Sequence, residues 1–481
     1  GFRNHLSTEL NLSEGLSVFY GNNGHGKSSL LEAIYMLSIA KSHKSSSDKE
    51  LINWLTLEEN GHMQILGISR NEDITTQAQI DIDASNKDLS FRKGLRINGI
   101  KCNSFDFVGN INSIFFEAED IEIIYGGPSK RRRYLDILIG QSVPSYLKDI
   151  QRYKRVIAQK NKLLRSIREK KSDKKELTFW NERLAYEGSK IIDLRRKSIS
   201  FLSSNSINHH IELSGGEEIE LKYKTKITSS KETQKIEIDS LSNEEIESKF
   251  LETLIQNSDN EVRQGISVYG PHRDDIEILF NNRLAGKYAS RGQARTIAFA
   301  LKLSEAIFVE NTTGRVPIII LDDILSELDP NRRNSILEIF KNYQQVILTV
   351  TESELLPNNI KQESNIYNIN SGKVKKKTFW KKKINQIATL LSESNYPVVM
   401  TGAGMSVESG IPPFRGTSGI WTKYGQPKLD SFSDFKKNPT KWWDNRRNLT
   451  IDKHIMELRE SLKNAKPHLG HYSLCRLEKN K

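Results

Sequence analysis

The chain has 481 residues, and its 72 Lys and Arg against 60 Asp and Glu give a formal net charge of +12 at pH 7. That length predicts several domains, and a pI near 9.3 favours an acidic partner, either nucleic acid or an anionic membrane surface. The two cysteines, Cys102 and Cys475, exclude a disulfide framework and a cysteine-ligated zinc site made by this chain alone. No apolar stretch approaches the roughly 20 residues that span a bilayer. We therefore expect a cytoplasmic protein with no membrane association, and a chain that is a fragment at its Gly1 end.

The most informative segment is Gly21-Asn-Asn-Gly-His-Gly-Lys-Ser28, which fits the pattern G-x-x-x-x-G-K-[ST] at every fixed position. Residues 16–20 before it predict a strand, and an amphipathic helix is expected to begin near Lys27. Backbone N–H groups and the lysine of such a loop bind nucleotide phosphates, and the serine hydroxyl ligates magnesium. An unrelated Gly-rich loop is the alternative, but it would not require this strand and helix. The predicted ATP-binding residues are Gly21, Asn22, Asn23, Gly24, His25, Gly26, Lys27, Ser28 and Ser29.

The run Val316-Pro-Ile-Ile-Ile-Leu-Asp-Asp323 predicts a strand that is buried on both faces and ends in two carboxylates. Carboxylates in that place can hold magnesium and polarise a water beside a γ-phosphate. We predict that Ser28 and Asp322 hold the metal ion and that Asp323 orients or deprotonates the water, so that Asp322 and Asp323 are the catalytic residues. A pair of solvated turn residues is the alternative.

A third motif, Ser290-Arg-Gly-Gln293, opens a predicted helix. The hydroxyl, the backbone N–H groups and the helix dipole make such a turn an anion site. A turn with a further acid, Asp329, follows the acidic strand. These motifs, in this order, resemble the ABC-type ATPase head. The resemblance implies an ATP-dependent homodimer, in which the partner's P-loop holds the ATP that is capped in trans by Ser290, Arg291, Gly292 and Gln293.

Four further segments resemble the RecF family of bacterial recombination mediators, namely Gly1–His5, Phe115–Asp120, Gly127–Asp136 and Gly270–Asp275. The resemblance covers residues 1–376, with one departure at Ala118, where a proline is expected. It implies an ATP-dependent DNA-binding protein of DNA replication, recombinational repair and the SOS response. Such a protein dimerises on ATP at gapped or single-stranded DNA, hydrolyses ATP slowly under the control of DNA, and works with RecR/RecO-type mediators.

The predicted fold class is α/β, with a P-loop ABC-type ATPase head that carries an inserted helical arm lobe. We expect residues 1–137 to form the first half of the head and residues 263–376 the second half, with the signature turn and the acidic strand. Residues 138–262 are expected to form the arm lobe, which resembles that of RecF. Exposed turns are expected there at Lys170–Lys175 and Ser229–Thr233.

Basic residues gather in two places, which makes them candidates for contacts with DNA phosphates. One is a compact cluster formed by Lys130, Arg131, Arg132 and Arg133. The other runs along a predicted helix and comprises Arg152, Lys154, Arg155, Lys160, Lys162 and Arg165. For the helix, the alternative is a solvated face with Leu163 and Leu164 turned inward.

The sequence changes character after residues 377–383, a basic linker or a small contact with DNA. Residues 384–392 predict an amphipathic helix and Pro397–Thr401 a buried strand. The Gly-rich segment Gly402–Gly416 follows, and with Gly419–Trp421 and Ala465–Tyr472 it resembles the NAD-binding part of the sirtuins.

This second resemblance implies a partial Rossmann-like sirtuin segment over residues 384–481, fused to the ATPase head, with NAD as a further cofactor. The residues placed near NAD are Gly402, Ala403, Gly404, Ser406, Ile411, Phe414 and Arg415. The catalytic histidine and the zinc-binding cysteines of sirtuins are expected beyond Lys481, and neither His468 nor His471 takes the catalytic role. We therefore expect this segment to bind NAD poorly and to catalyse nothing.

Three functions remain open. The first is a RecF-like DNA-repair ATPase. The second is a bifunctional protein whose longer form carries an NAD-dependent deacylase or NAD-hydrolase. The third is an SMC-like or transporter-type head, which the short insertion does not favour.

Overall fold

The computed structural model describes residues 1–59, 61–71, 74–84, 91–214, 216–227, 238–327, 330–352, 356–377, 387–415, 419–425, 432–447 and 453–479. The chain divides into two compact units, Gly1–Phe379 and Trp380–Lys481. Asp329, the turn expected at Ser229–Thr233 and residues 378–383 of the linker lie outside the described residues. Every helix in the described part of the chain is too short or too polar to cross a membrane.

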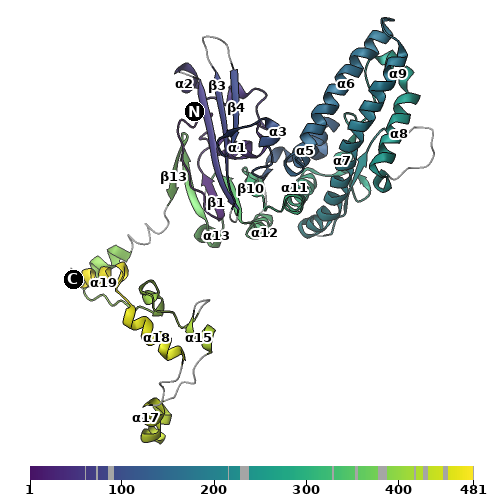
Figure 1. The fold of residues 1–481 in the computed structure, drawn as a ribbon. Coiled ribbons are helices and arrows are strands. Elements are labelled where there is room, and N and C mark those ends of the chain that lie inside the picture. Colours follow the sequence, from purple (N-terminus) through teal and green to yellow (C-terminus); the bar gives the residue numbers. More distant parts are fainter. Residues whose placement is uncertain are drawn as a thin grey trace. The chain divides into compact units, whose positions relative to one another are not determined.

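A six-stranded sheet with the order β13-β12-β1-β11-β10-β6 forms the centre of the first unit (Figure 1). Its strands are β1 (Gly15–Tyr20), β6 (Ser113–Phe116), β10 (Ile318–Leu321), β11 (Gln345–Val350), β12 (Asn365–Asn370) and β13 (Lys373–Lys377). All neighbours pair in parallel except β12 and β13, which form an antiparallel hairpin. The two sequence halves of the head therefore meet in one sheet.

Both faces of this sheet are covered, as continuous apolar strands require. On β10, Ile320 packs with helix α1 (Lys27–Ile39), whereas Ile319 and Leu321 belong to the core that contains helix α11 (Arg291–Thr313). The prediction of a strand buried on both faces is confirmed by these contacts, because Ile319, Ile320 and Leu321 are all 0% exposed.

Helix α1 also packs against a second, antiparallel sheet through Met36 and Leu37. This sheet has the order β2-β3-β4-β5, with β2 (His62–Asn71), β3 (Ile74–Ala84), β4 (Phe91–Ile97) and β5 (Ile100–Lys101). The P-loop helix is thus held between two sheets. Short elements connect them: η1 (Asp48–Leu51) and α2 (Trp54–Glu59) lie between α1 and β2, and α3 (Ser104–Phe107) lies between β5 and β6. Two more, η2 (Ala118–Ile121) and α4 (Glu122–Tyr125), lead from β6 to the next helix.

An elongated helical lobe, the arm lobe, extends from the head (Figure 1). Helix α5 (Pro128–Ser142) runs from the head across the expected boundary at residue 138 into this lobe. The lobe's other helices are α6 (Tyr146–Arg168), α7 (Leu177–Ser214), α8 (Asn243–Gln256) and α9 (Ser258–Gln264). Between α6 and α7, the residues from Lys170 to Lys175 form the expected exposed turn. A small sheet of β7 (Ile219–Lys224), β8 (Asp275–Phe280) and β9 (Arg283–Leu284) joins the arm to α10 (Ala285–Tyr288) and α11.

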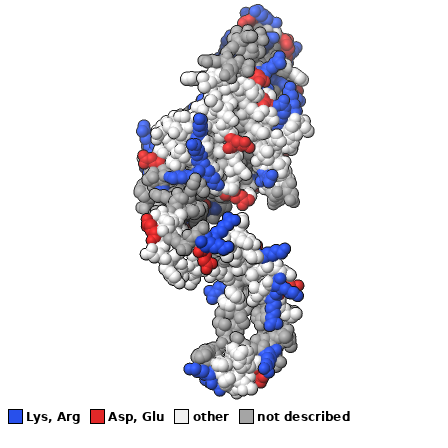
Figure 2. Space-filling model, turned by 90° about the vertical axis from the view of Figure 1, so that its left-hand side faces the viewer, with Lys and Arg blue, Asp and Glu red and all other residues white. Residues whose placement is uncertain are grey.

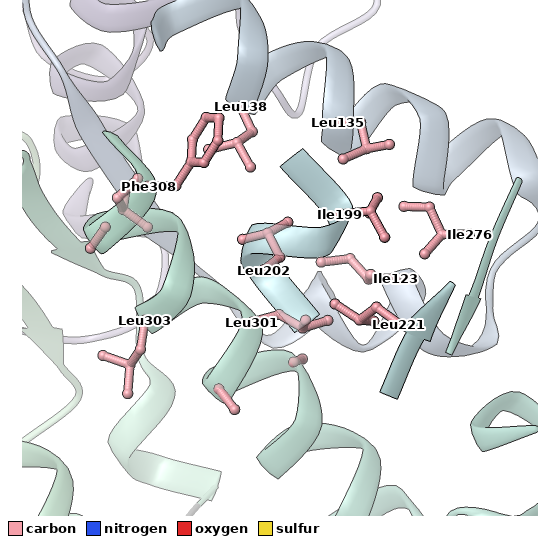
Figure 3. Close-up of a cluster of buried hydrophobic side chains, with 14 of the residues drawn as sticks. Ile123, Leu135, Leu138, Ile199, Leu202, Leu221, Ile276, Leu301, Leu303 and Phe308 are labelled. Carbon is pink, nitrogen blue, oxygen red and sulfur yellow. The ribbon is translucent and has the colours of Figure 1, made fainter. Parts of the chain in front are cut away.

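One apolar core runs from the arm lobe into the head (Figure 3). Leu135 of α5, Leu202 of α7 and Leu301 of α11 are each 1% exposed or less, and Leu221 and Ile276 come from β7 and β8. Because these side chains share one core, the arm cannot shift without disturbing the helix that begins at the signature turn.

The second unit contains helices 387–393, η7 (Ala403–Ser409), α15 (Ile420–Tyr424), α16 (Phe432–Lys437), α17 (Pro439–Arg447), α18 (Lys453–Asn464) and α19 (Leu469–Lys479). The predicted first helix is present, but Ile387 and Leu390 on it are 56% and 67% exposed. The strand expected at Pro397–Thr401 is wrong, since these residues are unpaired and Met400 is 95% exposed. A parallel strand needs neighbours to pair its N–H and C=O groups, and the described part of this unit supplies none.

Candidate functional site

The P-loop joins β1 to α1 and requires glycine at two of its positions. Gly26 caps α1 with φ of 107°, and a Cβ atom there would lie 2.7 Å from Nε2 of His5. A Cβ atom at Gly21 would lie 2.2 Å from the carbonyl oxygen of Ile369 on β12. Any larger side chain would therefore push the loop away from its two supports.

The N-terminal RecF-like segment braces this loop from outside. His5 Nε2 lies 2.9 Å from the Gly26 carbonyl oxygen, and its Nδ1 lies 3.0 Å from that of Gly372, in the turn between β12 and β13. Gly372 N–H in turn donates to the His25 carbonyl oxygen at 3.0 Å. The loop conformation is thus fixed by contacts from both ends of the first unit.

Lys27 lies inside the loop and is 6% exposed. Its ammonium donates to the carbonyl oxygens of Gly21 at 2.6 Å and Asn22 at 3.2 Å, and it lies 3.4 Å from Oδ1 of Asn23. Burial lowers the pKa of Lys27, and the carboxylates of Asp323 and Asp322 oppose that change. The acidic strand is therefore close enough to affect the charge of the P-loop lysine.

Ser28 and Asp322 meet although 294 residues separate them in the sequence. Ser28 Oγ donates to Asp322 Oδ1 at 2.9 Å, and Thr349 Oγ1 of β11 donates to the same oxygen at 2.9 Å. The Asp323 N–H donates to Thr349 Oγ1 at 2.9 Å, with φ of 52° at Asp323. A left-handed backbone is strained at a residue other than glycine, and the bond to Thr349 helps to hold Asp323 in this conformation.

These oxygen atoms fit magnesium, which takes hydroxyl and carboxylate oxygens together with phosphates and waters. Among the described residues, no group of three or more His, Cys, Asp or Glu side chains could hold a metal ion by itself. A site made of one hydroxyl, one carboxylate and the nucleotide is therefore the arrangement that this chain offers.

Two further residues at this site, Lys44 and Glu117, were not predicted as site residues. Lys44 Nζ lies 2.9 Å from Asp322 Oδ2, and Glu117 Oε2 lies 3.2 Å from His43 Nε2 and 3.9 Å from Lys44 Nζ. Glu117 belongs to the RecF-like segment that departs from the family pattern at Ala118. Asp120 Oδ2 accepts the Glu117 N–H at 2.8 Å in a capping box, so the turn forms without the expected proline.

The signature turn, Ser290–Gln293, caps α11. Ser290 Oγ accepts the Gln293 N–H at 3.3 Å, and Gln293 Oε1 accepts the Ser290 N–H at 2.9 Å. Gln293 Nε2 also donates to Glu217 Oε1 at 2.7 Å, whereas Arg291 is exposed and a Cβ atom at the half-buried Gly292 would lie 4.0 Å from Ser290 Oγ. The turn is therefore pre-formed on the surface of its own subunit.

A buried charged cluster connects α11 to the end of β6. Lys302 and Glu305 form an ion pair at 3.1 Å, with both side chains less than 10% exposed. Burial raises the pKa of nearby Asp120 to about 7, against the attraction of Lys302. Lys302 of α11, the helix that begins at the signature turn, thus interacts electrostatically with Asp120 in the turn at Glu117.

The structure divides the predicted DNA-binding cluster on α5. Lys130 and Arg133 are exposed. Arg131 Nε and Nη2 instead donate to the two carboxylate oxygens of Asp275 at 2.6 and 3.0 Å, and Arg132 Nη1 donates to the Asp274 carbonyl oxygen at 2.8 Å. Arg131 and Arg132 therefore join α5 to the Gly270–Asp275 segment.

On α6, Leu163 and Leu164 turn inward, as in the alternative of a solvated face, and so does Lys160. The prediction that Lys160 belongs to a phosphate-contacting face is wrong, because its side chain is 0% exposed and pairs with Glu261 at 2.6 Å. A buried lysine needs a counter-ion, and α9 supplies one.

In the second unit, the two sirtuin-like segments touch. His468 Nε2 lies 2.6 Å from the Met405 carbonyl oxygen, which gives this histidine a structural position. Gly402, Ala403 and Gly404 are exposed, and Ser406 and Ile411 are half-buried. The Phe414 ring and the Arg415 guanidinium pack on Trp421, at 5.1 and 5.4 Å from the centre of its ring.

The family model described as RecF/RecN/SMC N terminal domain matches residues 1–376, and the Sir2 family model matches residues 402–481. The DNA replication and repair protein RecF of Geobacillus kaustophilus (strain HTA426) is 33% identical over 380 residues, which cover 78% of this chain and 96% of that protein. RecF of Bacillus pumilus (strain SAFR-032) is 34% identical over 377 residues, covering 78% and 97%.

Solved structures agree with these relatives. The recombination mediator protein RecF-ATPrS of the RecFOR pathway has a TM-score of 0.69 at 30% identity, covering 78% of this chain and 96% of that one. RecF-ATP of the same pathway has a TM-score of 0.68 at 31% identity, covering 78% and 95%. With its P-loop, acidic strand and signature turn on this fold, the chain belongs to the RecF family of RecF/RecN/SMC N-terminal domains and also carries a Sir2-like segment.

Proposed function

We propose that this chain is an ATP-dependent DNA-binding protein of DNA replication, recombinational repair and the SOS response, which closes as a dimer on ATP. The observation that carries the proposal is the 2.9 Å contact between Ser28 Oγ and Asp322 Oδ1. It joins a P-loop to an acidic strand in a member of the RecF family, and similar solved structures are described as RecF-ATP. We place the protein in the cytoplasm, where such a protein would meet the chromosome.

In the proposed reaction, Lys27 exchanges its carbonyl partners for the outer phosphates of ATP. Ser28 and Asp322 hold magnesium, which when bound would neutralise charge on the phosphates. Asp323, one residue beyond, orients the attacking water or accepts its proton. Hydrolysis is proposed to be slow and modulated by DNA, with dimer closure before it and opening after it.

The signature turn is proposed to act in trans. In its own subunit, Gln293 contacts Glu217 and Ser290, and the backbone of the turn starts at two exposed residues, Ser290 and Arg291. The N-terminus of α11 is therefore available to the γ-phosphate of ATP bound by a second copy. This arrangement makes each ATP a bridge between two subunits.

DNA is proposed to contact exposed basic residues of the first unit. Figure 2 shows Lys and Arg side chains spread over the face that it displays, with Asp and Glu among them, so net charge alone does not mark one patch. The basic stripe, Lys154, Arg155, Lys162 and Arg165, lies on one exposed face of α6. It spans about 16 Å of helix, and none of its members forms an ion pair with a described residue.

The basic stripe and the exposed pair Lys130 and Arg133 replace the larger sequence-based set as DNA candidates. Phosphate contacts of this kind are independent of sequence and weaken with salt. Gapped duplex and single-stranded DNA, and RecR/RecO-type mediators, are the proposed partners. We further propose residues 138–262 as the arm lobe between head halves 1–137 and 263–376.

The proposal is tested by sedimentation of the chain with and without ATP-magnesium and a gapped duplex, at two salt concentrations. We expect an ATP-dependent dimer whose DNA binding weakens as salt rises. The Lys27→Met variant should bind no ATP and stay monomeric. A nucleotide-insensitive monomer that ignores DNA, or a Lys27→Met variant that still dimerises with ATP, would refute the proposal.

A second candidate function rests on the Sir2 match. A longer form of the chain would be a bifunctional ATPase with an NAD-dependent deacylase or NAD-hydrolase. We propose that residues 384–481 alone bind NAD weakly and catalyse nothing, because Gly402, Ala403 and Gly404 are exposed and follow an unpaired segment. Calorimetric titration with NAD is the test, and saturation at micromolar NAD would contradict this expectation.

A further inference from the structure

Both oxygens of the Asp322 carboxylate have partners, and one of these partners is a cation. Ser28 Oγ donates to Oδ1, and Lys44 Nζ donates to Oδ2 at 2.9 Å. Asp322 is 7% exposed, whereas the Lys44 side chain is 34% exposed and reaches the carboxylate from the loop between α1 and η1. An ammonium group therefore sits on the carboxylate that the proposed function assigns to magnesium.

The backbone of this loop, residues 41–47 (the Lys44 loop), is held in place from within. Ser42 Oγ accepts the N–H groups of Lys44 at 3.1 Å and Ser45 at 2.7 Å. Ser42 also bonds to Glu32 on α1, whose carboxylate forms an ion pair with Arg3 at 2.5 Å. Ser42 and Glu32 are each 1% exposed, so Lys44 starts from a fixed anchor.

Both ends of the Lys44 loop are tied to the antiparallel sheet by one side chain. Lys93 Nζ on β4 donates to the Ala40 carbonyl oxygen at 2.7 Å and to Asp48 Oδ2 at 2.8 Å. The two ends of the loop are thus held in place by Lys93, and the cationic side chain of Lys44 lies between them. A second acceptor for that cation is present, because Glu117 Oε2 lies 3.9 Å from Lys44 Nζ.

We propose that Lys44 is a resident counter-ion of Asp322, which magnesium displaces when it arrives with ATP. Two cations on one small carboxylate repel each other, and the dication is held by the phosphates as well. Displaced from Asp322, Lys44 passes to Glu117, and the Lys44 loop moves between its fixed ends. The loop then reports metal occupancy of the nucleotide site, an inference that rests on the proposed function.

Hydrogen exchange of residues 41–47 tests this proposal in the presence of ATP with EDTA and of ATP with magnesium. In the wild type, magnesium should raise exchange of the Ser45 amide several-fold, because movement of the loop loosens its bond to Ser42. Lys44→Met should give the same fast exchange with and without metal. Lys41→Met, a neighbouring exposed lysine of the same loop, should behave like the wild type.

If Lys44→Met folds poorly, the wild-type exchange with and without magnesium still tests the proposal; for a folded variant, metal affinity is a second measurement. Manganese titration of the ATP-bound protein, followed by electron paramagnetic resonance, should give several-fold tighter metal binding in Lys44→Met, and wild-type affinity in Lys44→Arg. Wild-type exchange that ignores magnesium, or metal affinity that is unchanged in Lys44→Met, would overturn the proposal. Failure to bind ATP in EDTA would instead overturn the nucleotide site itself, and this inference with it.

Discussion

The ammonium of Lys160 lies 2.6 Å from Oε2 of Glu261, and the two side chains are 0% and 1% exposed. The pair joins α6 to α9 inside the arm lobe. The other carboxylate oxygen of Glu261 accepts bonds from Ser267 Oγ at 2.7 Å and Val268 N–H at 2.9 Å. A lysine in the middle of a basic helix thus holds the arm together and is not available to DNA.

Lys160→Met should therefore destabilise the first unit by about 3–5 kcal/mol, because Glu261 would remain buried without its counter-charge. Urea unfolding followed by circular dichroism measures this loss. The double variant Lys160→Met/Glu261→Gln should recover part of it, since the uncompensated charge is removed. Equal stability of Lys160→Met and the wild type would contradict the buried pair.

Lys162→Ala, two residues further along α6, should affect DNA binding and leave stability almost unchanged. Its side chain is exposed in the basic stripe, so stability should change by less than about 0.5 kcal/mol. The plot of the logarithm of the DNA association constant against the logarithm of salt concentration should become shallower, its negative slope losing about 1 in magnitude. Fluorescence anisotropy with a labelled gapped duplex at several salt concentrations measures it, and an unchanged slope would remove Lys162 from the DNA-binding surface.

Two substitutions at Ser290 separate its capping role from its proposed role in trans. Ser290→Asp keeps an acceptor for the Gln293 N–H but places a negative charge where the γ-phosphate should lie. Ser290→Arg also removes the cap, which costs about 1 kcal/mol. Both variants should bind ATP and fail to dimerise in sedimentation, whereas only Ser290→Arg should unfold earlier. ATP-induced dimers of Ser290→Asp would argue against the trans arrangement.

His272 should make stability depend on pH. Its Nε2 lies 3.1 Å from the Ser267 carbonyl oxygen and its Nδ1 lies 2.7 Å from Tyr153 Oη, partners that suit the neutral ring. Burial lowers the pKa of His272 to about 4. Below pH 6.5 the unfolded chain takes up a proton that the folded protein does not bind. The stability that His272 contributes is therefore complete above pH 6.5 and is lost as pH falls to 4.

The loss amounts to at most about 3.5 kcal/mol, from about 2.5 pKa units at roughly 1.4 kcal/mol each. Urea midpoints measured from pH 4 to 7 test it. His272→Gln should flatten the pH profile, because glutamine does not titrate. A His272→Gln profile as steep as that of the wild type would assign the pH dependence to other groups.

Much of the nucleotide site could be predicted from the sequence, because its geometry is set by local motifs. The P-loop, the buried strand at Ile318–Leu321 and the capped turn at Ser290 each follow from a short pattern. Lys44 could not be found in this way, since its meeting with Asp322 depends on how a loop after α1 folds across the sheet edge. No residue pattern in residues 41–47 marks that contact.

Dependence on distant parts of the chain also explains two wrong predictions, the placing of Lys160 on a DNA-contacting face and the strand at Pro397–Thr401. The spacing of basic residues on α6 does not say that Lys160 faces α9, because Glu261 is a hundred residues further along the chain. The apolar run at Pro397–Thr401 has the composition of a strand, but composition alone is not enough. A strand also needs neighbouring strands to pair with. Tertiary partners decided both outcomes.

Because β1 lies between β11 and β12, its sheet can form only late during synthesis on the ribosome. Asp322 is translated 294 residues after Ser28, which takes about 15 to 60 seconds at 5–20 residues per second. At the end of that interval β1 still has neither of its sheet neighbours, β11 and β12, whereas all the helices of the arm lobe have been synthesised. The nascent chain can therefore form its arm helices first, but it cannot bring Asp322 to Ser28 until most of the first unit has been made.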